Sequence, residues 1–255
     1  STFLESFDIR TAYPLLLALL EMELSASDWS SISTSLESYL VRRAVCGLTT
    51  KNYNRVFLTL TRGLRREGLT PENLIGLLLE LTGDSGEWPS DARFRDHWQN
   101  SNAYDTLRNA KITHILKRIS DTYIDAKMED VTLETKLSVE HILPQNWQEH
   151  WPLSDGSRGL TYEQLEALDV ADPRALATRR RDEALQTMGN LTIITGTLNS
   201  SASNAGWLEK KAKLLLHTIL PINQDLHRWE LWDETTISGR SEVLLERALK
   251  IWPRG

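Results

Sequence analysis

The chain has 255 residues, of which 40% are hydrophobic and nine are tryptophan, and its formal net charge is −6 at pH 7. This size and this apolar content provide for a substantial core and exclude a disordered chain. The acidic balance argues against a protein that binds nucleic acid over its whole surface, although it leaves room for a local basic channel. The single cysteine, Cys46, excludes an internal disulfide and a cysteine-rich zinc site, and it favours a cytoplasmic location.

No apolar run approaches the ~18 residues of a membrane-spanning helix, and the first residues lack the basic and apolar regions of a signal peptide. We therefore expect no membrane partner. Because the sequence starts at Ser1 and not at a methionine, we expect a further domain upstream that this chain lacks.

Residues 1–130 are predicted to form a helical subdomain. An apolar run of Leu and Ala without β-branched residues follows Pro14, which suits a first helical turn. A capping cluster at residues 25–28 precedes a helix that stops at Gly47, and Thr70 caps another. The predicted helices cover residues 15–20, the segment from the capping cluster to Gly47, and residues 50–65, 71–81, 91–99 and 104–125.

The sequence pattern changes near Met128, and residues 131–255 are predicted to form a second subdomain. Short strand candidates at 131–133, 137–139 and 191–195 replace the long helices. Residues 148–184 are polar and rich in turn signals, among them Asp172–Pro173, so we expect an insertion here that contains only a short helix at 162–168. Amphipathic helices are predicted for residues 207–220 and 241–252.

Two segments of this second subdomain contain the candidate active-site residues. The first runs S-V-E-H-I-L-P-Q-N-W over residues 138–147, with Glu140 and His141 side by side at the end of an apolar run. The second runs M-G-N-L-T-I-I-T-G-T-L-N over residues 188–199, with one asparagine before the predicted strand and another nine residues later. The order acid–histidine, strand, asparagine, strand, asparagine, helix is what a one-metal site for phosphodiester cleavage needs.

Hydrolysis of a phosphodiester needs a base that activates water and a cation that stabilises the developing charge. His141 is the candidate base, because an imidazole with a pKa of about 6.5 can accept a proton near neutral pH. Glu140 and Asn199 offer oxygen ligands to Mg²⁺ or Mn²⁺, which keeps several waters and also binds phosphate. Asn190 joins the catalytic set as the residue that fixes the loop carrying His141. Neighbours on an ideal strand point to opposite faces, so Glu140 and His141 share a site only if the strand ends there.

Basic residues near these segments are the candidate contacts to nucleic acid. Lys210 and Lys211 lie on the amphipathic helix that follows the second segment, where they could meet a phosphate. Other short basic clusters are interpreted as solvated helix faces. Among the remaining histidines, His150 lies nine residues after His141 and is the one that could approach the site. Taken singly, the histidine, the glutamate and the asparagines would be ordinary structural or turn residues, but their order and spacing favour an active site.

These segments resemble the HNH (ββα-metal) nuclease superfamily, and more closely the C-terminal domain of GmrSD-type modification-dependent restriction proteins, a group that includes SspE-like anti-phage nucleases. The resemblance rests on E-H-I-L-P-Q-N-W, on M-G-N-L-T-I-I-T with L-N, and on S-N-x-x-W-L-E-K-K. It implies that His141 is the general base, that Glu140 and Asn199 bind the metal, and that Asn190 is the central asparagine of the HNH motif. Asn199 stands where the third HNH residue is usually histidine.

The resemblance also implies a fold, a function and partners. The expected fold is α+β and mainly α, a helical bundle packed on a small ββα-metal (HNH) core. The expected function is that of a metal-dependent DNA endonuclease or nickase, the cutting module of a restriction or anti-phage defence protein whose N-terminal domain senses modified DNA and hydrolyses nucleotide. Two alternatives stay open: a catalytically inactive nucleic-acid-binding module, and an RNase that uses the same site. One site per chain favours nicking, and a double-strand cut would need a homodimer or two events.

Overall fold

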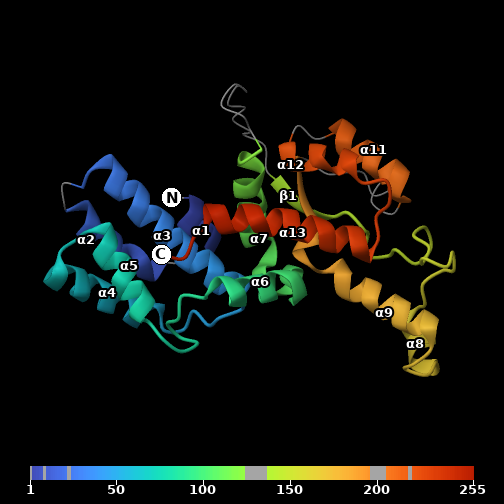
Figure 1. Cartoon of the computed structure of the whole chain (residues 1–255), viewed down its shortest axis with the longest axis horizontal. Coiled ribbons are helices and arrows are strands. Elements are labelled where there is room, and N and C mark those ends of the chain that lie inside the picture. The colour runs from blue at the N-terminus through green and yellow to red at the C-terminus, as the bar shows by residue number, and fades with distance from the viewer. Residues whose placement is uncertain (1, 8–9, 22–23, 124–136, 196–204, 218–219) are drawn as a thin grey trace. The chain divides into compact units, whose positions relative to one another are not determined.

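The computed structural model describes residues 2–7, 10–21, 24–123, 137–195, 205–217 and 220–255 (Figure 1). Contacts within the chain define two compact units, one of residues 1–98 with 246–255 and one of residues 99–245. The predicted subdomain boundary near residue 130 lies outside the described residues. In the part of the chain that the structure describes, no helix combines the length and apolarity needed to cross a bilayer.

Helices make up the regular structure of the first unit, and local capping explains where they begin. The Ser25 hydroxyl accepts a hydrogen bond from the Asp28 amide at 3.1 Å, and the Thr70 hydroxyl accepts one from the Asn73 amide at 3.2 Å. Gly47 follows the longest of these helices with a φ of 63°, which glycine adopts without strain. The structure thus confirms the predicted helix starts at Ser25 and Thr70 and the predicted helix end at Gly47. The helices are α1 (Thr2–Phe7), η1 (Arg10–Ala12), α2 (Tyr13–Leu20), α3 (Ala26–Val45), α4 (Tyr53–Glu67), α5 (Pro71–Glu80), α6 (Asp91–Asn100) and the end of α13 (Glu234–Ile251).

A buried arginine on α3 joins the loops of the first unit. Arg43 is fully buried and donates hydrogen bonds to the main-chain oxygens of Glu87 at 2.7 Å, Thr49 at 2.8 Å and Asp84 at 2.8 Å. Its Nε also donates to the Tyr53 hydroxyl at 3.2 Å. The guanidinium therefore has partners on several sides, as a buried charge requires.

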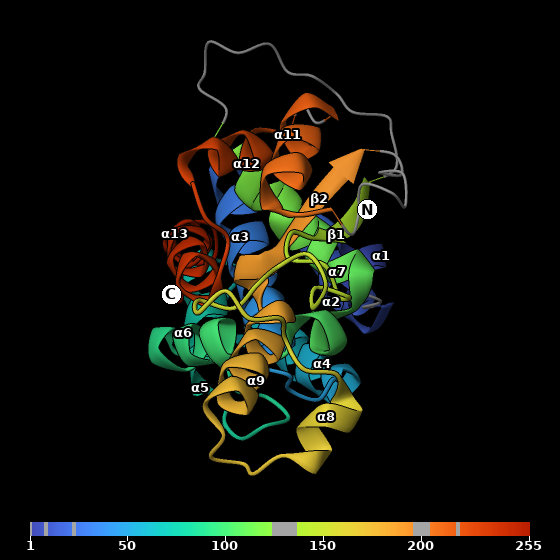
Figure 2. The same cartoon turned by 90° about the vertical axis from the view of Figure 1, so that its right-hand side faces the viewer.

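The second unit contains a two-stranded antiparallel sheet and several helices. Strand β1 (Leu137–His141) pairs with β2 (Leu191–Thr195), so that Glu140 lies opposite Thr192 and His141 opposite Leu191. Helix α7 contacts both strands, as Figure 2 shows. The described chain is thus mainly helical with a small sheet, in agreement with the expected α+β, mainly α class. The predicted strand at 131–133 lies outside the described residues. The other elements are α7 (Ala103–Asp121), α8 (Tyr162–Ala167), α9 (Pro173–Leu185), η2 (Met188–Asn190), α11 (Trp207–His217), α12 (Pro221–Gln224) and η3 (Asp225–Arg228).

The segment 148–184 is more ordered than its polar sequence predicts. The expected short helix is present as α8, with a capping box at Thr161, but a second helix, α9, was not predicted. The Asp172 side chain accepts hydrogen bonds from the amides of Arg174 and Ala175, at 2.9 and 3.0 Å. Asp172–Pro173 is therefore a helix start and not a turn, because the aspartate caps α9 and the proline occupies its first turn.

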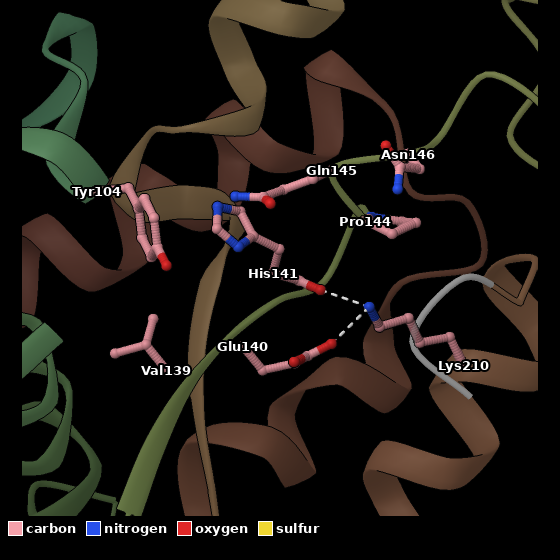
Figure 3. A pocket seen from close by; sticks show the side chains of 8 residues that line it. All are labelled: Tyr104, Val139, Glu140, His141, Pro144, Gln145, Asn146 and Lys210. Carbon is pink, nitrogen blue, oxygen red and sulfur yellow. Dashed lines mark hydrogen bonds and ion pairs between the residues drawn. The ribbon is translucent and has the colours of Figure 1, made fainter. Parts of the chain in front are cut away.

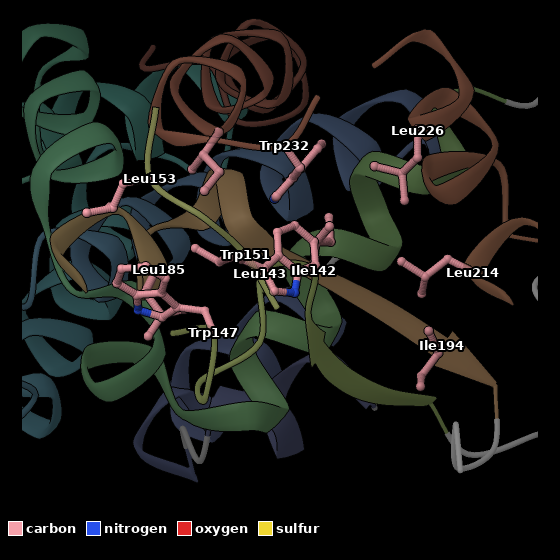
Figure 4. Packing of buried hydrophobic residues seen from close by; sticks show 11 residues of the cluster. Ile142, Leu143, Trp147, Trp151, Leu153, Leu185, Ile194, Leu214, Leu226 and Trp232 are labelled. Carbon is pink, nitrogen blue, oxygen red and sulfur yellow. The ribbon is translucent and has the colours of Figure 1, made fainter. Parts of the chain in front are cut away.

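Helix α9 and the loop before α8 enclose Trp147, a core residue of the second unit (Figure 4). The Trp147 indole donates to Asp182 at 2.8 Å, and the Arg181 guanidinium lies 5.0 Å from its ring centre. A Cβ atom on Gly159 would come within 2.2 Å of the indole, so only glycine fits there. The segment 148–184 is thus part of the core that supports β1. The core consists of Ile142, Leu143, Trp147, Trp151, Leu153, Leu185, Ile194, Leu214, Leu226, Trp232 and Ile237.

Candidate active site

An open cavity of about 260 Å³ lies at the carboxyl end of β1 (Figure 3). It brings together Glu140, His141 and Lys210, three of the predicted site residues, although Lys210 is 69 positions from His141 in the chain. Because β1 ends at His141, adjacent side chains that an ideal strand would separate both reach one cavity. The full lining consists of Tyr104, Val139, Glu140, His141, Pro144, Gln145, Asn146 and Lys210.

His141 is held in one orientation by two neighbours. Its Nε2 lies 2.9 Å from Oε1 of Gln186, and its ring centre lies 4.6 Å from that of Tyr104 in an edge-to-face arrangement. An amide oxygen can only accept a hydrogen bond, so Nε2 carries the proton and Nδ1 has the lone pair in the neutral ring. Burial lowers the pKa of His141, and the hydrogen bond to Gln186 and the charge of Glu140 only partly oppose this effect. The neutral form, which can accept a proton, is therefore favoured near pH 7.

Glu140 forms an ion pair with a buried lysine. The Lys210 Nζ lies 2.8 Å from Oε1 of Glu140 and donates a hydrogen bond of 2.6 Å to the main-chain oxygen of His141. The Glu140 side chain is 19% exposed, whereas that of Lys210 is 1% exposed. Burial lowers the pKa of Lys210, while Glu140 acts in the opposite direction. The pair therefore places a partly exposed carboxylate at the cavity wall, with its buried counter-ion beside it.

The two lysines predicted to contact nucleic acid are both engaged by the protein. Lys210 is the buried partner of Glu140 and not a surface cation. Lys211 donates to the main-chain oxygens of His227 at 3.0 Å and Trp229 at 2.7 Å, and its ammonium lies 5.6 Å from the centre of the Trp207 ring. These contacts fix α11 beside the site, because main-chain oxygens outside the helix hold its first turns.

Asn190 fastens the loop that follows His141. Its side-chain oxygen accepts hydrogen bonds from the Leu143 amide at 2.7 Å and the Trp232 indole at 3.0 Å. Its side-chain nitrogen donates to the main-chain oxygens of Leu143 at 3.0 Å and Leu185 at 2.9 Å. The side chain is fully buried, and these bonds use all the hydrogen-bonding capacity expected of an amide. Asn190 therefore lies beneath the loop that follows His141, where the sequence analysis expects it to fix that loop, and not at the cavity surface.

A second layer supports the start of β2. Arg240, on α13, donates to the main-chain oxygens of Gly189 at 2.7 Å and Leu191 at 2.8 Å. A Cβ atom on Gly189 would lie 2.1 Å from the main-chain oxygen of Ile237, so glycine permits this close approach of α13. Complete burial lowers the pKa of Arg240 to about 10. The main chain on both sides of Asn190 is thereby held directly by α13.

Gln186 and Tyr104 are site residues that the sequence analysis did not identify. Besides contacting His141, Gln186 accepts hydrogen bonds through its main-chain oxygen from the amides of Ala103 at 3.0 Å and Tyr104 at 3.2 Å. One residue thus holds both the imidazole and the start of α7, which carries the aromatic ring packed on that imidazole. The signal in the sequence is weak, because Gln186 precedes the second motif and Tyr104 lies far from both motifs in the chain.

The donors at the cavity suit a divalent cation of the Mg²⁺ or Mn²⁺ type. The partly exposed carboxylate of Glu140 and the exposed amide side chains of Gln145 and Asn146 are oxygen ligands, which these ions prefer. Asn199, the other predicted ligand, lies outside the described residues. Within the described ranges, no group of three or more His, Cys, Asp or Glu side chains is placed to hold a metal. A site here would therefore rely on few protein ligands together with water and substrate.

Comparison with known protein families gives a match over much of the chain. Residues 88–247, more than half of the chain, match the family model described as GmrSD restriction endonucleases, C-terminal domain. The matched region includes β1, β2, α9 and every residue that lines the cavity. No curated protein and no solved structure matched the chain.

Proposed function

The chain belongs to the family of GmrSD restriction endonuclease C-terminal domains, a nuclease family, and from this membership we propose that it is a metal-dependent HNH endonuclease that cleaves or nicks DNA. The observation that supports the proposal most strongly is the pairing, on one cavity, of a buried imidazole with a partly exposed carboxylate. Phosphodiester hydrolysis requires such a base beside a place for a cation.

In this proposal, His141 acts as the general base. Its Nδ1 takes a proton from the attacking water while Nε2 stays bonded to Gln186, which keeps the ring in place as its charge changes. The protonated ring is then stabilised by the amide oxygen of Gln186 and the nearby charge of Glu140. Asn190 acts through the loop that it fastens, so it positions His141 without contacting the substrate.

Glu140 and Asn199 would hold the divalent cation, with waters completing its coordination. When bound, the metal neutralises charge on the scissile phosphate and its leaving oxygen. Glu140 is suited to this role because its carboxylate reaches the cavity while its Oε1 is already oriented by Lys210. The exposed amides of Gln145 and Asn146 could donate hydrogen bonds to a phosphate at the same wall.

We further propose that DNA is the substrate, that the domain is the cutting module of a modification-dependent restriction or anti-phage protein, and that a separate N-terminal domain recognises modified DNA. A single site per chain makes nicking the expected primary event. Linear product would then arise from a homodimer or from two independent cuts.

The proposal is tested by incubating supercoiled plasmid with the protein and Mg²⁺ or Mn²⁺, beside an EDTA control and the Glu140→Ala variant. We expect conversion to open circles, lost in EDTA and strongly reduced in the variant. If neither metal supports conversion while the protein still retards DNA in a gel, the domain is a non-catalytic binding module. Faster cleavage of an RNA of matched sequence would identify an RNase.

A further inference from the structure

Lys210 occupies an unusual place in the second unit. It is a fully buried cation, and its ammonium contacts the carboxylate of Glu140 and the main-chain oxygen of His141 at the end of β1. Four residues further along α11, Leu214 is buried in the hydrophobic core. Lys211 is held by main-chain oxygens outside the helix. The helix therefore delivers the ammonium to Glu140 in a defined position, and the side chain is not free to turn to solvent.

Lys210 contacts the carboxylate of Glu140. Of the two proposed metal ligands, Glu140 is the one that lies among the described residues. A divalent cation bound to Glu140 would lie within a few ångströms of the ammonium, which is itself 2.8 Å from Oε1. Like charges at this separation repel strongly where protein limits access of water. The phosphate of a bound substrate carries the opposite charge, so it would offset that repulsion and supply further oxygen ligands.

We propose that Lys210 is a positioning residue that holds Glu140 at the cavity wall and weakens divalent metal binding there until a phosphodiester is bound. The inference rests on the proposed function, because it takes Glu140 as a metal ligand. The inference goes beyond the proposed function because it couples metal binding to substrate binding. Lys210 would thus keep the site from retaining metal tightly on its own, and it would act through Glu140 without touching the substrate.

The test is Mn²⁺ binding measured by calorimetry on full chains that carry His141→Ala, so that DNA can be present without being cut. In the absence of DNA, we expect Lys210→Met to bind Mn²⁺ about tenfold more tightly than the His141→Ala parent. Lys213→Met is the matched control, since Lys213 lies on the same helix but pairs with Glu209, and it should bind as the parent does. A short DNA duplex should tighten Mn²⁺ binding more in the parent than in Lys210→Met.

Thermal melting separates this role from a purely structural one. In EDTA, Lys210→Met should melt below the parent because Glu140 loses its counter-ion, and Mn²⁺ should raise its melting temperature more than that of the parent. Should Lys210→Met fail to fold, Lys210→Gln, which keeps a hydrogen-bond donor without the charge, takes its place.

The outcomes distinguish this inference from the proposed function. Folded Lys210 variants that bind Mn²⁺ no more tightly than the parent would overturn the inference alone. If no variant binds Mn²⁺, with or without DNA, both the inference and the metal-dependent function are wrong.

Discussion

Arg43 in the first unit and Lys210 in the second are both fully buried cations, yet they have different partners. Arg43 donates to several main-chain oxygens and to the Tyr53 hydroxyl, which are neutral groups. Lys210 forms an ion pair with the carboxylate of Glu140, which is partly exposed on an open cavity. The arginine therefore joins segments of the fold, whereas the lysine pairs with a carboxylate that solvent can reach.

The difference shows that burial of a charge does not by itself indicate a functional site. A buried cation is tolerated wherever enough acceptors surround it. What distinguishes Lys210 is that its carboxylate partner lies on an open cavity, beside a buried imidazole of lowered pKa. Groups with perturbed pKa values that converge on a cavity are the ones that chemistry can use.

The largest expected effect in the first unit is on stability. Arg43→Met removes the donor for buried or partly buried acceptors and should lower the free energy of unfolding by about 3 kcal/mol, measured by urea denaturation. Arg66→Met, at an exposed position, should leave it unchanged within the error of the measurement. Folded Arg43→Met should still bind Mn²⁺ as the parent chain does. A loss of metal binding without a loss of stability would invalidate the comparison of the two units.

A smaller effect, confined to activity, is expected at Gln186. Gln186→Ala removes the hydrogen bond to His141 Nε2 and should reduce kcat by about 10- to 100-fold, the range typical of residues that orient a reactive group. Gln164→Ala, which alters only the cap of exposed helix α8, is the control and should cleave at the parental rate. Nitrogen-15 NMR of the imidazole should show the Nε2–H tautomer in the parent chain. Predominance of the Nδ1–H tautomer would contradict the assignment of Nδ1 as the base.

The smallest expected effect is a shift in pH dependence. The proposed base acts as a neutral imidazole, and burial lowers its pKa from 6.5, so cleavage should stay constant as pH falls to 6.5 and decline only below it. Gln186→Ala removes a contact that raises this pKa, so its decline should begin at still lower pH. The check is a profile of kcat/KM in Mn²⁺ from about pH 5 to about pH 8. An acidic decline that begins above pH 6.5 would show that the imidazole is not held as described.

Local signals in the sequence predicted much of the fold and the centre of the site. Side chains that cap their own helices, such as Ser25 and Thr70, act over three residues and can be recognised without tertiary structure. Glu140 and His141 were recognisable because they end a short apolar run. Helix α9 was missed because Asp172–Pro173 suits both a turn and a helix start, and only packing against Trp147 decides between them.

The remaining features depend on contacts between distant segments. Gln186 reaches His141 across 45 positions, and nothing at either position indicates that the other is near. Lys210 lies in a run of charged residues that is typical of a solvated helix face, so its burial follows only from the way α11 packs beside β1. The predicted ligand Asn199 lies outside the described residues, and its role stays a prediction.

The central claim is that His141 is the base of a metal-dependent nuclease, and the most direct measurement is the rate of plasmid cleavage by His141→Ala in Mg²⁺ or Mn²⁺. The control is His150→Ala, an exposed histidine nine residues away in the chain, and both variants should melt within a few degrees of the parent. We expect His141→Ala to lose cleavage by at least about 10²-fold and His150→Ala to retain it. Cleavage by folded His141→Ala at the parental rate would contradict the account.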